Sequence, residues 1–379
     1  MHVGYSAFFQ NLSGQLTDAE VYRHELAMAD RAEPLGFDSV WAPEHHFTNY
    51  IMMPDTTQFL TWVAARTKHV QIGSMINVLP WHDPVRLCEE WSMLDAMSEG
   101  RAILGLGRGL GRVEFDGFRT EMSESRGRFT EYTTAIVDAL ESGYIEFDGE
   151  WLQQPRSAIR PFPSRSFRGR TYASAVSPQS IDLMARLGIG LLIIAQKPWS
   201  VTTAEIAEYR ERFMELNGEP PPAPIIAVFI AVDEDPGKAQ EMFDKYIMNY
   251  SHSAVDHYQF YDEGIAEIPG YEYYAGISAN IAKHGRDTFA SFLAELQVWG
   301  TPEQVADKLK EYQRMVGAAG IIGVFSYGGM PYKEAEQNMK LFAEKVLPLL
   351  HDHEVESGVG KAGPATAGAS ALSDTKVRW

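Results

Sequence analysis

The sequence predicts an α/β protein with a single (β/α)8 TIM barrel and insertions after the fourth and seventh strands. Short apolar runs alternate with segments of helical periodicity along the chain. The length of 379 residues is large for one ordinary domain but suits an α/β barrel. The stretches that carry chemistry each follow a predicted strand, which is where barrel active sites are built. Together these observations favour a parallel sheet closed into a barrel.

Each expected strand is a short apolar run bounded by turn or loop residues. The eight runs are residues 3–9, 38–42, 70–78, 102–104, 171–175, 190–195, 225–232 and 321–325. A strand that is buried on both faces reads as a continuous apolar run, as these do.

The expected helices are recognised by their caps and by apolar spacing. Thr17 with Glu20, and Thr301 with Gln304, have the spacing of a capping box. Pro84 follows Asp83 at a first helical position, where its missing N–H costs nothing. The helices are expected near residues 18–33, 55–66, 84–99, 125–141, 178–185, 203–217, 235–257, 302–316 and 335–346.

Two stretches do not fit the alternation. Residues 143–170 contain three prolines and little periodicity, and so long a loop is more often functional than filler. Residues 258–290 are aromatic-rich and irregular, which indicates either a lid near the rim or a structural or dimer-facing segment. We expect the barrel domain to span residues 1–353, and residues 354–379 to form a low-complexity, flexible tail.

The composition restricts the classes of partner. The chain has 33 Lys and Arg against 51 Asp and Glu, a net charge of −18. Such a chain repels nucleic acid and anionic membranes, so we expect small molecules and further copies of the chain as partners. The single cysteine, Cys88, excludes an internal disulfide and fits a reducing compartment. With no signal peptide and no membrane-length apolar run, the protein is expected to be cytoplasmic.

The stretch after the second predicted strand is the main catalytic candidate. Residues 41–48 read Trp-Ala-Pro-Glu-His-His-Phe-Thr, which places His45, His46 and Glu44 on the barrel rim. Histidine is well suited to move a proton near neutral pH. The alternative is a structural histidine that bonds the loop backbone. The adjacent histidines should point in different directions, so no metal site is expected.

Two later stretches are candidates for anion binding. The glycine-rich segment 105–112 lacks the G-x-G-x-x-G spacing, because Leu110 and Arg112 occupy the positions that need glycine. No helix is expected directly after it; the next should begin near Ser123. A loop of this kind can bring backbone amides and Arg108 to an anion, although a tight loop with a solvated arginine is the alternative. Ser177, at a helix start, suits a phosphate or is an ordinary cap.

Taken together, these motifs resemble the bacterial luciferase-like flavin-dependent monooxygenase superfamily, in particular the luciferase α-subunit. The resemblance runs from about residue 1 to 350. It is carried by residues 41–48, 78–80 with 82–86, 94–101, 107–110, 123–126, 300–304 and 339–342.

The resemblance implies a two-component monooxygenase. It would use reduced FMN, delivered by a separate NAD(P)H:flavin reductase, and O2 to form a C4a-(hydro)peroxyflavin that oxygenates a small, largely apolar organic substrate. It also implies a homodimer or higher oligomer. The alternatives are an F420-dependent hydride-transfer oxidoreductase, a non-catalytic flavin-binding protein and, least favoured, a metal-dependent hydrolase that uses His45, His46 and Glu44.

The same resemblance assigns residues to roles. His45 matches the catalytic histidine, and Met75 with Ile76 match a strand segment, often with a cis peptide, that backs the isoalloxazine. Gly107 and Val176 stand where luciferase has a cysteine and a glutamate, which argues against light emission and an aldehyde substrate. The expected cofactor-binding residues are Met75, Ile76, Gly107, Arg108, Arg126, Val176, Ser177 and Ser180.

Aromatic residues near the ends of predicted strands are candidates for the substrate pocket. An apolar, closable pocket would protect a reactive intermediate from water. Ordinary core packing is the alternative for each of these residues. The candidates are Phe8, Trp41, Trp81, Trp199, Trp299 and Phe325.

Overall fold

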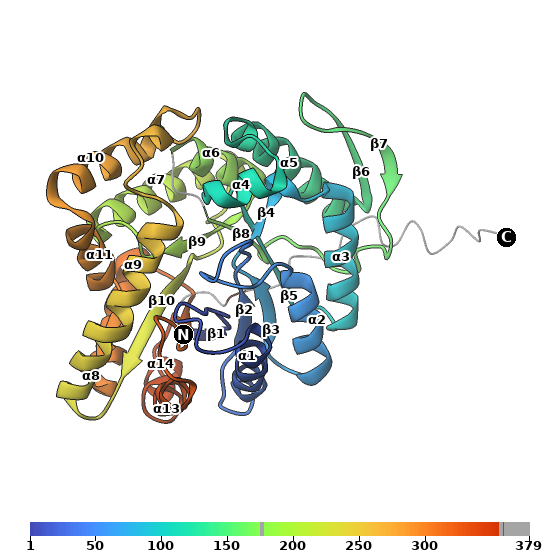
Figure 1. The fold of residues 1–379 in the computed structure, drawn as a ribbon. Coiled ribbons are helices and arrows are strands. Elements are labelled where there is room, and N and C mark those ends of the chain that lie inside the picture. Colours follow the sequence, from blue (N-terminus) through green and yellow to red (C-terminus); the bar gives the residue numbers. More distant parts are fainter. Residues whose placement is uncertain (175–177, 356–358, 360–379) are drawn as a thin grey trace.

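The chain folds into a closed barrel of parallel strands surrounded by helices (Figure 1). The computed structural model describes residues 1–174, 178–355 and 359. Within that part of the chain, the hydrogen-bonded order is β1, β2, β3, β5, β8, β9, β10 and β12. The barrel closes where β12 pairs with β1, with Val3 opposite Ile321. The predicted fold class is confirmed.

The barrel strands are short and largely buried. They are β1 (His2–Ser6), β2 (Ser39–Ala42), β3 (Gln71–Ser74), β5 (Ala102–Gly107), β8 (Thr171–Ala173), β9 (Gly190–Ile194), β10 (Ile225–Val232) and β12 (Gly320–Val324). Two shorter strands extend the sheet: β4 (Asn77–Val78) pairs with β5, and β11 (Val298–Gly300) pairs with β10. All eight residues of β10 are buried, as expected of a strand with helices outside and packed side chains inside.

The helices that have a cap signal at Thr17, Asp83 or Thr301 begin at that signal, whereas the helices expected near 203 and 335 begin earlier, at Trp199 and Tyr332. The capping boxes at Thr17 and Thr301 are both formed. The helices are α1 (Asp18–Ala32), α2 (Thr56–Arg66), α3 (Pro84–Met97), α4 (Arg112–Phe118), α5 (Ser125–Ser142), α6 (Pro178–Leu187), α7 (Trp199–Asn217), α8 (Pro236–Met242), α9 (Met248–His257), α10 (Ala275–His284), α11 (Arg286–Glu295), α12 (Pro302–Val316), α13 (Tyr332–Leu341) and α14 (Leu347–His351). Among the described residues, no helix has the length and apolar content needed to cross a membrane.

One helix contradicts the sequence-based expectation. Helix α4 begins at Arg112, directly after the glycine-rich loop, where no helix was expected before Ser123. It has only seven residues, and its N-cap, Gly111, makes no side-chain cap hydrogen bond. A helix this short cannot show the repeated apolar spacing by which helices are recognised. Its position is important because it carries Glu114 to the rim of the barrel.

The stretch 143–170 also differs from the expectation of an irregular loop. It contains an antiparallel hairpin of β6 (Tyr144–Asp148) and β7 (Gln153–Ala158), on the opposite flank of the molecule from α10 and α11 in Figure 1. Pro155 lies in β7, and both strands of a two-stranded ribbon are edges, where proline is tolerated. Proline and the shortness of the strands concealed this hairpin in the sequence.

The aromatic segment 258–290 forms short helical turns and α10, and α11 continues it to Glu295. Phe260, Tyr271 and Tyr274 pack in a small apolar cluster of their own with Phe115 of α4. The insertion is therefore tied to the helix that follows β5. The expected C-terminal tail lies largely outside the described residues, although Val359 is buried in the main core.

Candidate active site

A large pocket opens at the carboxyl ends of the barrel strands. Its volume is about 1170 Å³, counted to its open mouth. Phe8 follows β1, His45 follows β2 and Ser174 follows β8, and all three line it. Since several strands contribute lining residues just past their ends, this is the position of active sites in barrels of this type.

Most of the predicted site residues that the structure describes meet in this pocket. The lining includes His45, Met75, Ile76, Gly107, Arg108, Ser180 and Phe8. Arg126 does not line it, but it donates a hydrogen bond to the same backbone oxygen as Arg108, that of Gly270. Val176 and Ser177 lie outside the described residues, so their assignment stays a prediction.

One wall of the pocket is formed by Met75, Ile76 and Gly107. The peptide bond between Met75 and Ile76 is cis, and it divides the single strand expected at 70–78 into β3 and β4. A Cβ atom on Gly107 would lie 1.6 Å from Cδ1 of Ile76. A side chain at position 107 would therefore displace the wall formed by Ile76, whereas glycine leaves it in place.

Two arginines meet beside the pocket. Arg108 Nη1 and Arg126 Nη2 donate to the same backbone oxygen, that of Gly270, at 2.6 and 3.0 Å. The Arg108 guanidinium also lies over the Tyr271 ring, 4.1 Å from its centroid. Burial, and then the nearby charge of Arg108, lower the pKa of Arg126. Two guanidiniums on one uncharged oxygen form a positive site that suits an anion.

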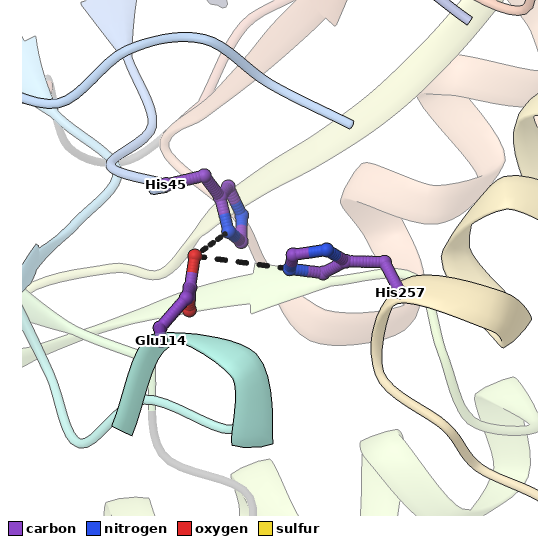
Figure 2. Close-up of side chains that lie close together, drawn as sticks. All are labelled: His45, Glu114 and His257. Carbon is purple, nitrogen blue, oxygen red and sulfur yellow. Dashed lines mark hydrogen bonds and ion pairs between the residues drawn. The ribbon is translucent and has the colours of Figure 1, made fainter. Parts of the chain in front are cut away.

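His45 belongs to a buried cluster that the sequence did not reveal (Figure 2). Its Nδ1 lies 2.8 Å from Oε1 of Glu114, on α4. The backbone N–H of His46 donates to the same oxygen at 3.0 Å. His257, at the end of α9, places its Nε2 3.8 Å from that oxygen. Three segments far apart in the sequence thus meet at one carboxylate.

The surroundings of this cluster are aromatic. The Tyr258 hydroxyl lies 3.3 Å from His45 Nε2, and the His257 ring stacks on Tyr50 at 4.2 Å. Burial, followed by the charge of His45, lowers the pKa of His257 to about 2. His257 is therefore neutral near pH 7. Burial also raises the pKa of Tyr258, which keeps its hydroxyl protonated.

The neighbouring residues Glu44 and His46 form a separate network. Glu44 accepts hydrogen bonds from Val78 N at 2.9 Å and Trp81 Nε1 at 2.6 Å, and contacts His46 Nε2 at 3.0 Å and His82 Nε2 at 2.9 Å. Burial alone would raise the pKa of Glu44, but the charge of His82 and the hydrogen bonds lower it to about 2. As predicted, the adjacent histidines point in different directions, so the trio His45, His46 and Glu44 does not converge.

The expected aromatic walls need correction. Of the six candidates only Phe8 lines the pocket. The indoles of Trp41 and Trp81 donate hydrogen bonds, to Ser39 Oγ and to the Glu44 carboxylate. The other three rings pack against other aromatic rings: Trp199 on Tyr312, Trp299 on Phe243 and Phe325 on Phe37. A position near the end of a strand does not determine which way a side chain points. The aromatic lining comes instead from Tyr50, Phe229, Tyr250, Tyr258 and Tyr274, together with Phe8 and Phe129.

Sequence reasoning missed Glu114 and His257. Glu114 lies on a helix too short to be recognised, and His257 follows a long helical pattern with no local motif. A signal was available only for Glu114, because a carboxylate shortly after the glycine-rich loop must lie on the same rim as Arg108.

Comparisons with known proteins find relatives in sequence and in fold. The alkanal monooxygenase alpha chain of Photorhabdus luminescens is 26% identical over 348 residues, covering 90% of this chain and 95% of that relative. The oxygenating constituent of 3,6-diketocamphane monooxygenase from Pseudomonas putida, solved with FMN, shares the fold at 16% identity and a TM-score of 0.70, covering 92% of this chain and 98% of that chain. An F420-dependent secondary alcohol dehydrogenase shares it at 17% identity and a TM-score of 0.67, covering 93% and 99%.

The family itself follows from the extent of one match. The family model described as luciferase-like monooxygenase matches residues 1–319, which is most of the chain. The resemblance seen in the motifs is thereby confirmed, and the chain belongs to the luciferase-like monooxygenase family.

Proposed function

We propose that this protein is the oxygenating component of a two-component monooxygenase, which uses reduced FMN and O2 to oxygenate a small, largely apolar substrate. One observation carries the proposal: a single pocket combines a glycine-backed wall, a guanidinium and an imidazole, at Gly107, Arg108 and His45. These are the three features that a flat ring, its phosphate and a proton transfer require.

The residues present fit a flavin. The wall at Met75, Ile76 and Gly107 suits a planar ring, since a Cβ at 107 would clash with the Ile76 side chain and displace it. Arg108 lines the pocket and Arg126 donates to the same Gly270 oxygen, which suits a phosphate dianion. Ser180 also lines the pocket, and its hydroxyl would bind the same phosphate. When bound, reduced FMN supplies two electrons and the carbon that reacts with oxygen.

The protein's own part in the reaction is to control a proton. Because Nδ1 of His45 is paired with the Glu114 carboxylate, Nε2 is the atom left for proton exchange. An imidazole can take up and release a proton near neutral pH, so His45 can hold a proton at Nε2 and return it. Tyr258, 3.3 Å from Nε2, helps to orient the ring.

The pocket also limits access by water. Phe8, Phe229 and Tyr250 make up part of its apolar lining, and Tyr258 and Tyr274 come from the insertion and the end of α9. An apolar enclosure protects reactive intermediates from side reactions with water. We therefore assign this lining to the organic substrate and to the exclusion of water.

Two partners complete the proposal. The loop 105–112 lacks dinucleotide spacing, which supports a separate NAD(P)H:flavin reductase as the source of reduced flavin. Met93 and Met97 on α3 are 47% and 53% exposed, which supports a homodimer formed through helices beside the early strands.

The test combines binding and turnover. Anaerobic titration with reduced FMN should give saturable binding that Arg108→Ala weakens roughly 10-fold or more, as loss of a charge-assisted hydrogen bond predicts. Arg119→Ala, at the exposed C-cap of α4, is the control. With NADH and a generic flavin reductase, a substrate screen read by mass should detect oxygenated product.

Two results would replace this proposal by an alternative. Tight F420 binding with hydride transfer and no oxygen requirement would indicate an F420-dependent oxidoreductase. Flavin binding without substrate-dependent oxygen consumption in any screen would indicate a non-catalytic flavin-binding protein.

A further inference from the structure

The cluster of His45, Glu114 and His257 has the composition of a metal site. One ligand atom from each residue lies within 4.8 Å of the others. Two imidazoles and one carboxylate are a ligand set that divalent transition metals use, and zinc sites of this kind leave a further position for a ligand from solvent. Figure 2 shows the three side chains pointing toward one another from a loop, α4 and α9.

His257 provides the second observation. Its side chain is 2% exposed, and its Nε2 has no hydrogen-bond partner among the residues that the structure describes. This atom points toward Glu114 Oε1 but stops 3.8 Å away, too far for a hydrogen bond. A buried polar atom without a partner calls for an explanation, and an ion between the two groups is one.

The second ring nitrogen of each histidine is already held by a neighbour. His257 Nδ1 lies 3.3 Å from Thr48 Oγ1, and His45 Nε2 lies 3.3 Å from the Tyr258 hydroxyl. Metal-binding histidines usually bond a second residue through the ring nitrogen that does not face the metal. This arrangement leaves His45 Nδ1 and His257 Nε2 as the two inward-facing atoms.

We propose that His45 Nδ1, Glu114 Oε1 and His257 Nε2 bind one divalent transition-metal ion of the Zn²⁺ class, with its remaining position toward the pocket. Ligand atoms around a tetrahedral Zn²⁺ lie roughly 3.4 Å apart. The two separations in this cluster, 2.8 and 3.8 Å, fall on either side of that value. All three atoms lie within 4.8 Å of one another, so side-chain rotations would have to bring any wider pair closer for coordination.

A consequence for catalysis rests on the proposed function. A metal bound to Nδ1 would replace the hydrogen bond between His45 and Glu114 and would place a cation beside the imidazole that is proposed to exchange the proton. Metal binding should therefore inhibit oxygenation, and removal of the metal by a chelator should restore it. The metal site would then act as an inhibitory site within the active site.

The experiment measures binding directly. The whole protein, freed of metal by a chelator, is titrated with Zn²⁺ by calorimetry, and with Co²⁺ to record the visible absorption of the bound ion. We expect one ion per chain. His257→Gln and Glu114→Gln should each weaken binding by more than the roughly 10- to 100-fold that loss of an outer-sphere partner costs. His252→Gln, on the exposed face of the same helix α9, is the matched control and should bind as the wild type does.

Circular dichroism and the melting temperature verify that each variant is folded. The Co²⁺ spectrum of the wild type decides the question if a variant does not fold, because bound tetrahedral Co²⁺ absorbs far more strongly than the free ion. Absence of stoichiometric uptake, or unchanged binding in both ligand variants, would overturn the proposal. Since these readouts need no turnover, they stand even if the protein proves not to be an oxygenase.

Discussion

Two histidine–carboxylate clusters lie side by side in this molecule, and they differ in how fully the carboxylate is bonded. Glu44 has four hydrogen-bonding partners, which include His46 and His82. Glu114 has two, the ring of His45 and the backbone N–H of His46, and it also faces an imidazole nitrogen that has no partner. A saturated carboxylate fixes a loop, whereas an incompletely bonded one beside a pocket can take part in chemistry.

The largest difference in oxygenation rate should appear when one histidine of each cluster is replaced in turn. His45→Gln should lower the rate of coupled oxygenation roughly 100- to 10,000-fold, the usual contribution of a general acid–base group. His46→Gln should change this rate much less, because its ring contacts Glu44 and not the His45 cluster. Single-turnover kinetics with reduced FMN measure both. Equal losses in the two variants would remove the functional distinction between the clusters.

For protein stability we expect the opposite order: replacement of Glu44 should cost more free energy of unfolding than replacement of Glu114. Glu44→Gln should lower the free energy of unfolding by about 3 kcal/mol or more, because it breaks a buried ion pair with His82. Glu114→Gln should cost about 1 to 2 kcal/mol, since it weakens only two hydrogen bonds, those with the His45 ring and the His46 backbone. Urea unfolding at neutral pH gives both values. A larger loss for Glu114→Gln would reverse the comparison.

The pH dependence of stability sharpens the same contrast. The pKa of Glu44 is lowered from 4.5 to about 2, so its contribution is present above 4.5 and is lost as the pH falls toward 2. The pKa of His82 is raised by Glu44 against the effect of burial, so its contribution is present below 6.5 and is lost as the pH rises through the folded pKa. Unfolding free energies at several pH values should therefore fall below pH 4.5 less steeply in Glu44→Gln than in the wild type. Parallel curves would contradict this assignment.

The smallest effects should come from the outer partner of each cluster. Tyr258→Phe removes the hydroxyl near His45 Nε2 and should lower the oxygenation rate only a few-fold, with a displaced pH profile. Trp81→Phe removes a hydrogen bond to Glu44, so it should cost about 1 kcal/mol of stability and leave that pH profile in place. Measurement of the oxygenation rate against pH distinguishes the two variants. A displaced pH profile in Trp81→Phe would contradict the view that the two clusters are independent.

Much of the fold could be predicted because its signals are local. The capping boxes at Thr17 and Thr301, and the apolar runs of the strands, need only neighbouring residues to be recognised. Helix α4 and the hairpin β6–β7 were missed because they are too short for a periodic pattern, and Pro155 conceals β7. His45 and Arg108 were found because both directly follow a strand.

The sequence by itself determined the barrel, the helix starts and the presence of His45, Arg108 and Ser180 on one rim, because hydrophobic periodicity and strand order are properties of the linear chain. Only the tertiary structure decided that Glu114 and His257 turn toward His45, and that Glu44 turns away to His46 and His82. It also decided that Trp41 and Phe325 pack in the core while Tyr50 and Phe229 line the pocket. Side-chain direction depends on which distant segments pack together, and no local pattern records that choice.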